Sequence, residues 1–181
     1  MPTLPFPKLT PDEAAALIPH NALVGFSGFT AAGAVKAVPR ALSARSKEEG
    51  AKGKPLGLRL IAGASAGDFV DEQMAQAGAI AWRTPFQSSP TLRKQINSGQ
   101  VNFLDMHLSH LPQLIEFGFF GKLDVAVVEA TEVTPDGRVY LTTSGGVTPT
   151  LLRHAEKVII EVNSAPSPRL WEMHDIAILP R

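Results

Sequence analysis

Short apolar runs alternate with amphipathic segments along most of the chain. The apolar runs predict buried strands at 22–26, 58–62, 80–82, 101–104, 124–128 and 158–162. The segments between them predict helices at 10–18, 35–46, 68–76, 90–98, 111–117 and 147–154. This alternation is typical of the α/β class, so we expect a mainly parallel sheet with helices on both faces.

Local signals mark several boundaries of these elements. Thr10-Pro11-Asp12-Glu13 has the pattern of a capping box with proline at the first helical position. Ser88 and Ser89 precede Pro90 in the same way. The segment 134–137 is a turn that leads into a small hairpin ending at 139–141. The Pro-rich residues 163–181 are interpreted as an exit segment without an element of its own.

Length and composition restrict the function classes. The 181 residues suit one domain, with 44% hydrophobic and 19% charged residues. The absence of cysteine excludes a disulfide scaffold, a thiolate zinc site, a cysteine nucleophile and an iron–sulfur cluster. The formal net charge of zero lacks the basic footprint of a nucleic-acid binder. We therefore expect no nucleic-acid partner.

The N-terminal residues have neither the basic nor the apolar region of a signal peptide. The longest uncharged stretch, 21–35, is too short and too rich in glycine to span a membrane. We expect a cytoplasmic protein without a membrane partner.

In open α/β sheets, ligands bind beyond the carboxyl ends of the strands. The segments expected there are 27–30, 63–65, 84–86, 105–107, 129–131 and 163–164, in which glycine and small or hydroxyl-bearing residues are frequent. Such residues let a backbone approach a ligand closely. The same residues also suit ordinary turns between strands and helices, so composition leaves both interpretations open.

Common nucleotide and catalytic motifs are absent. Neither the dinucleotide fingerprint, nor the Walker A loop, nor the nucleophile elbow of serine hydrolases occurs. His107 and His110 are three residues apart, but no carboxylate stands at ligand spacing beside them. We expect no metal site.

Glu129 directly follows an apolar run. A carboxylate partly desolvated in a cleft would suit acid–base or nucleophilic chemistry. The alternative is that Glu129 accepts a backbone N–H or pairs with an arginine and so holds its turn.

Seven segments together resemble the acetyl-CoA hydrolase/transferase family, which contains single-chain CoA-transferases. They are 24–42, Gly-Ala-Ser-x-Gly at 63–67 with the strand before it, 83–99, Asp-x-His-Leu at 105–108, 127–131, 155–163 and 174–176. They occur in family order, and the resemblance as a whole covers roughly 9–176, nearly the whole chain.

The resemblance implies a NagB/RpiA-like fold and the transfer of coenzyme A between an acyl-CoA and a small carboxylate. In this family the reaction proceeds through an acyl–glutamyl anhydride and a glutamyl-CoA thioester. Coenzyme A is then a substrate, and no cofactor is bound permanently.

Family members have two similar domains, and the nucleophilic glutamate lies in the second, whose motif is absent here. We therefore expect 1–181 to be the N-terminal domain, with no catalytic residue of its own and no activity alone. Glu129 should not inherit the nucleophile's role. The expected partner is the second CoA-transferase domain, and the full protein is expected to be a homo-oligomer.

The resemblance places one wall of the substrate cleft in this chain. The six residues expected at the substrate are Gly28, Phe29, Thr30, Gly33, Ser65 and His107. The first four would supply a wall and backbone donors, and Ser65 a hydroxyl group. Their alternative roles are turn geometry, a helix cap at Ser65 and a hydrogen-bonded core histidine at His107.

Two other functions remain open at this point. The chain could be a noncatalytic α/β module that senses an acyl-CoA or a sugar phosphate. It could also be a structural subunit whose partner carries the chemistry.

Overall fold

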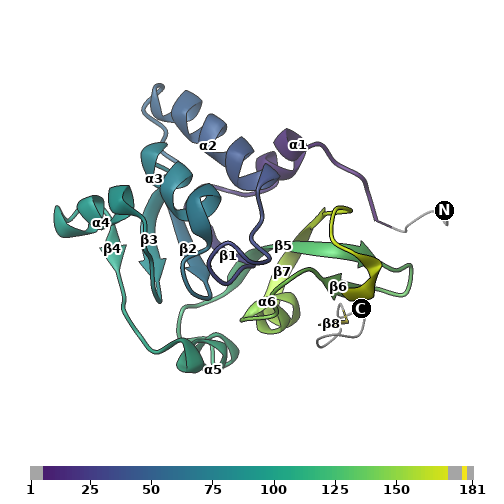
Figure 1. The fold of residues 1–181 in the computed structure, drawn as a ribbon. Helices are drawn as coiled ribbons and strands as arrows, with labels where there is room; N and C mark the ends of the chain where they lie inside the picture. Colours follow the sequence, from purple (N-terminus) through teal and green to yellow (C-terminus); the bar gives the residue numbers. More distant parts are fainter. Residues whose placement is uncertain (1–5, 171–176, 179–181) are drawn as a thin grey trace.

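An eight-stranded, mostly parallel sheet is the centre of the computed structural model, which describes residues 6–170 and 177–178 (Figure 1). The strands are β1 (Leu23–Phe26), β2 (Leu58–Ala62), β3 (Ile80–Thr84), β4 (Asn102–Phe103), β5 (Leu123–Val133), β6 (Arg138–Leu141), β7 (Ala155–Val162) and β8 (Ala177–Ile178). Their order is β4-β3-β2-β1-β5-β6-β8, and β7 also pairs with β5. Strands β1 to β5 and β7 are parallel, whereas β6 is antiparallel to both β5 and β8.

Helices cover both faces of this sheet (Figure 1). The helical segments are α1 (Pro11–Ala16), α2 (Ala37–Gly50), η1 (Asp68–Glu72), α3 (Gln73–Gln76), α4 (Pro90–Asn97), η2 (Leu108–His110), α5 (Leu111–Glu116), α6 (Thr148–His154) and η3 (Pro168–Leu170). Side chains of α1 to α4 share one hydrophobic core with Val125 and Val127 of β5. Those of α5 and α6 share a second core with Ala126 and Val128. The predicted α/β architecture with helices on both faces is confirmed.

The local helix signals are also confirmed. Thr10 caps α1 and forms a reciprocal capping box with Glu13. Ser89 caps α4 by accepting the Leu92 N–H at 3.0 Å, and Pro90 is the first helical residue. None of the helices within 6–170 and 177–178 is long and apolar enough to cross a membrane.

Three details of the predicted elements are wrong. Helix α2 continues to Gly50, beyond the predicted end at residue 46. The segment 68–76 is not one α-helix, because its first five residues form the π-helical turn η1. The exit segment contains η3 and also β8, which pairs with β6 and so adds an edge to the sheet.

Strand β5 is longer than predicted, and this changes the position of Glu129. Glu129 does not end the strand, since β5 continues to Val133 and leads through the predicted turn into β6. However, β1 reaches only Val127 of β5, and β6 begins to pair at Ala130. Glu129 therefore lies where the sheet passes from β1 to β6, beside the loop that follows β1.

Candidate functional site

Two glycine-containing loops meet at the carboxyl ends of β1 and β2. A Cβ atom added at Gly63 would lie 3.1 Å from the carbonyl oxygen of Gly28, and one added at Gly67 would lie 3.5 Å from that of Thr30. A side chain at position 63 would therefore press on the backbone of the first loop, and glycine avoids this contact. The structure thus brings the loop 27–36 against the loop 63–67, as their shared sheet edge predicts.

The loop 27–36 contains a tight turn with an unusual backbone. The Phe29 N–H donates to the Ala32 carbonyl at 2.9 Å, and the Ala32 N–H donates back at 3.2 Å. Between them Thr30 has a φ of 57°, which is costly for a β-branched residue. The side chain of Phe29 is 47% exposed. The turn therefore presents an apolar ring and a strained backbone at the sheet edge.

Ser65 is buried and bonded inside the protein. Its hydroxyl group donates to Asp71 Oδ2 at 2.7 Å, and the Ala66 N–H donates to the same oxygen at 3.2 Å. Arg83 pairs with this carboxylate through Nε at 2.8 Å and Nη2 at 3.2 Å. The only proton of the Ser65 hydroxyl is thus engaged by Asp71, and donation to a ligand requires that this bond be exchanged.

The ion pair of Asp71 and Arg83 is a feature that the sequence analysis missed. Both side chains are almost fully buried, at 1% and 0% exposure. Arg83 follows the apolar run of β3, and a charged residue inside a buried strand requires a partner. The sequence could therefore have indicated that Arg83 has a buried acidic partner, but not that this partner is Asp71.

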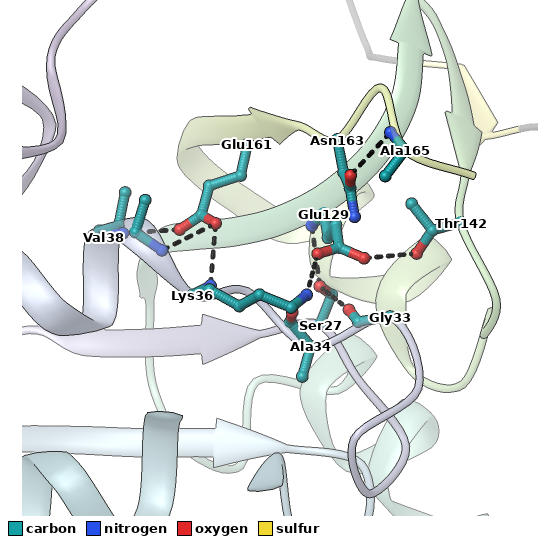
Figure 2. A network of polar contacts seen from close by, with 11 residues as sticks. Ser27, Gly33, Ala34, Lys36, Val38, Glu129, Thr142, Glu161, Asn163 and Ala165 are labelled. Atoms are coloured by element: carbon teal, nitrogen blue, oxygen red, sulfur yellow. Dashed lines mark hydrogen bonds and ion pairs between the residues drawn. The ribbon is translucent and has the colours of Figure 1, made fainter. Parts of the chain in front are cut away.

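Glu129 lies in a polar network at the end of β1 (Figure 2). Its side chain is 5% exposed, forms an ion pair with Lys36 Nζ and accepts the Thr142 hydroxyl at 2.8 Å. The Glu129 N–H donates to Ser27 Oγ at 2.9 Å, and that hydroxyl donates to the Gly33 carbonyl at 2.8 Å. Glu129 is therefore held in place, but the predicted backbone or arginine partner of its carboxylate is wrong: the partners are a lysine and a threonine.

Glu161 stands directly beside Glu129 in the paired strands β5 and β7. Its carboxylate accepts the backbone N–H groups of Lys36, Ala37 and Val38 at 2.8, 3.0 and 2.6 Å (Figure 2). It thereby caps the N-terminus of α2 from another part of the chain. Two neighbouring carboxylates are thus both satisfied by the segment around Lys36.

His107 lies apart from these loops. It is exposed, precedes η2 and packs edge-on against His110, with ring centroids 5.4 Å apart. The sheet order places β3 and β2 between β4, which precedes His107, and β1. The predicted alternative of a core histidine is wrong. Within 6–170 and 177–178, no group of three or more histidines and carboxylates could hold a metal ion.

A cavity of about 570 Å³ lies elsewhere, along β2, β3 and β4 near α5. Its lining includes Arg59, Trp82, Leu104 and Phe119, and Arg59 Cζ lies 5.4 Å from the Trp82 ring centroid. None of the six predicted substrate residues lines it. The cavity is therefore distinct from the strand-end loops.

The chain is similar to one family of known proteins over nearly its whole length. A family model described as the acetyl-CoA hydrolase/transferase N-terminal domain matches residues 3–180. A propanoyl-CoA:succinate CoA transferase of Escherichia coli is 48% identical over 171 residues, which are 94% of this chain and 35% of that protein. An acetyl-CoA hydrolase of Neurospora crassa is 41% identical over 92% of this chain and 32% of its own length. The chain spans about a third of the length of these relatives.

Solved structures share the fold. RipA from Yersinia pestis has a TM-score of 0.69 and 21% identity over 87% of this chain and 37% of its own. Glutaconate coenzyme A-transferase from Acidaminococcus fermentans has a TM-score of 0.62 and 13% identity over 84% of this chain and 68% of its own.

Proposed function

Because the chain belongs to the acetyl-CoA hydrolase/transferase family, through its N-terminal domain, we propose that it forms one wall of the cleft in which an acyl-CoA and a small carboxylate exchange coenzyme A. The observation that carries this proposal is the meeting of the loops 27–36 and 63–67 at one sheet edge. This is the place where α/β sheets bind ligands. Relatives named as CoA transferase and as acetyl-CoA hydrolase support coenzyme A thioesters as the substrate class.

In this proposal the first loop meets the substrate through its backbone. Gly28 and Gly33 have φ values of 126° and 65°, which residues with a side chain rarely adopt, so glycine lets the chain turn at both positions. Phe29 supplies an exposed apolar surface, and Thr30 lies in the turn with a strained backbone. Ser65 supplies a hydroxyl group when a substrate carboxylate replaces its bond to Asp71. We assign His107 no substrate contact.

The nucleophile of the reaction belongs outside this chain. Glu129 is buried and bonded to Lys36 and Thr142, which is a poor arrangement for attack on a thioester. The family resemblance assigns the nucleophilic glutamate to a second domain, and this chain spans about a third of its relatives. We therefore propose that the second domain completes the cleft and that coenzyme A passes through as a substrate.

The test compares this chain with the full-length protein that carries it. Each is incubated with acetyl-CoA and succinate, transfer is followed chromatographically, and covalent adducts are sought by mass spectrometry. We expect transfer by the full-length protein, and neither transfer nor an adduct with the 181-residue chain. A stoichiometric adduct on Glu129 would overturn the proposal. Acyl-CoA binding by a full-length protein without turnover would favour a sensing module.

A further inference from the structure

The loop 27–36 is fastened at both ends by neighbouring strands. At its start, Ser27 Oγ accepts the N–H of Glu129 and bonds the Gly33 carbonyl, which draws the loop closed. At its end, Lys36 gives its ammonium group to Glu129 and its backbone N–H to Glu161. Figure 2 shows Lys36 lying between the two carboxylates.

These contacts compensate the repulsion between the carboxylates of Glu129 and Glu161. Glu129 and Glu161 occupy directly paired positions of β5 and β7, so their side chains lie on the same face of the sheet. Lys36 Nζ neutralises Glu129, while the N-terminus of α2 receives Glu161. A buried carboxylate is tolerated only when it is paired and hydrogen-bonded. The end of the loop and the start of α2 thus compensate the negative charges that β5 and β7 carry.

The loop also contains a strained backbone at Thr30, which other contacts have to hold in place. Thr30 has a positive φ, and a β-branched residue in this conformation persists only where the surrounding structure fixes it. The turn itself contributes only the two bonds between Phe29 and Ala32. The contacts at Ser27 and Lys36 bracket the turn on both sides.

We propose that Glu129 and Glu161 are positioning residues that act through Ser27 and Lys36 to hold the loop in its substrate-binding shape. These four residues are called the loop clamp below. That the shape serves a substrate rests on the proposed function, whereas the clamp itself does not. Since Glu161 already accepts the N–H groups of residues 36–38, these three groups are not available to a substrate anion.

Amide hydrogen exchange of the chain tests the clamp directly. In Glu129→Gln, the carboxylate that bonds Lys36 is lost with little change of shape. We expect the Phe29 and Ala32 amides to lose protection by roughly 10- to 100-fold, as for loss of a hydrogen bond to a buried charge. Amides of α4, such as that of Arg93, should change far less. An equal loss of protection at all of these amides would reduce Glu129 to a general stabilising role and overturn the proposal.

Lys36 variants separate charge from packing. Lys36→Arg keeps the cation and should keep most of the loop protection, whereas Lys36→Met should lose it. Lys36→Met leaves a carboxylate buried without its cation, so folding itself could fail. The double variant Lys36→Met with Glu129→Gln removes both charges and should fold with an unprotected loop. Normal loop protection in this double variant would overturn the proposal.

The matched control is the exposed ion pair of Lys122, which directly precedes β5, with Glu156 near the start of β7. Lys122→Met with Glu156→Gln should leave the protection of the loop amides unchanged.

In the full-length protein, Glu129→Gln should lower kcat/KM for CoA transfer by about 10-fold or more, and Lys36→Arg should retain most of the wild-type kcat/KM. An inactive wild-type protein with a normally clamped loop would refute the proposed function and leave the clamp standing.

Discussion

Glu72 joins the end of η1 to the start of α4, and its replacement by glutamine should destabilise the protein at neutral pH. Its carboxylate accepts the hydroxyl groups of Ser89 and Thr91, the Thr91 N–H at 3.1 Å and the Gln76 amide at 2.8 Å. These bonds, with that from Ser89 the largest contribution, lower the pKa of Glu72 from 4.5 to about 2. The folded protein therefore prefers the ionised carboxyl group.

The size of the effect follows from this pKa. A pKa lowered from 4.5 to about 2 corresponds to roughly 3 kcal/mol in favour of the folded state when the group is ionised. Glu72 is only partly buried, and water can replace some of its partners in the variant. We therefore expect Glu72→Gln to lose about 1–2 kcal/mol at pH 7, which for a chain of this size is roughly 2–8 °C in Tm.

The pH dependence distinguishes this mechanism from a packing defect. A lowered pKa stabilises the folded state above pH 4.5, and the contribution is lost as the pH falls through the folded-state value of about 2. Urea unfolding of wild type and Glu72→Gln should thus converge between these pH values. Glu48→Gln, at an exposed carboxylate paired with Lys52, is the control and should change little. A difference that stays constant from pH 7 to pH 3 would refute the reasoning.

Three further changes test other parts of the structure. Arg83→Met should lower the free energy of unfolding by about 3–5 kcal/mol, because buried Asp71 loses its cation; a loss under about 1 kcal/mol in urea unfolding would contradict the pairing. Ser65→Ala should lower kcat/KM of the full-length protein by roughly 10- to 150-fold; an unchanged value would limit Ser65 to holding Asp71. Gly33→Ala should reduce Tm more than Gly53→Ala, since both have positive φ but only a Cβ at Gly33 meets a neighbouring side chain, at 3.2 Å; equal losses would exclude that contact as a constraint.

Local chemistry explains why much of the fold was predictable from the sequence. The caps at Thr10 and Ser89 involve residues within one helical turn, so their residue types identify the helix starts. The central strand was recognisable because both of its faces are covered, which makes its residues continuously apolar. The sheet edge that brings the loops 27–36 and 63–67 together follows from the parallel arrangement alone.

The contacts that the sequence did not reveal join distant residues. Lys36 and Glu129 are 93 residues apart, and Lys36 and Glu161 are 125 apart. A carboxylate after an apolar run indicates the end of a strand when it is considered alone, and so the predicted strand stopped before Glu129. The structure instead continues β5 through this position, because Lys36 compensates the charge and Thr142 satisfies the second oxygen.

The carboxylates of Asp71 and Glu129 are both engaged by neighbouring side chains, and this bears on whether either one can react. A reacting carboxylate has to keep a lone pair and its charge available to the substrate. In contrast, Asp71 is enclosed by Arg83 and Ser65, and Glu129 by Lys36 and Thr142, so both carboxylates are committed to their own loops. Each cluster stands at the base of one of the two loops that meet at the sheet edge. The buried charges of this domain thus hold its two loops, which agrees with the proposal that the nucleophile is supplied from outside this chain.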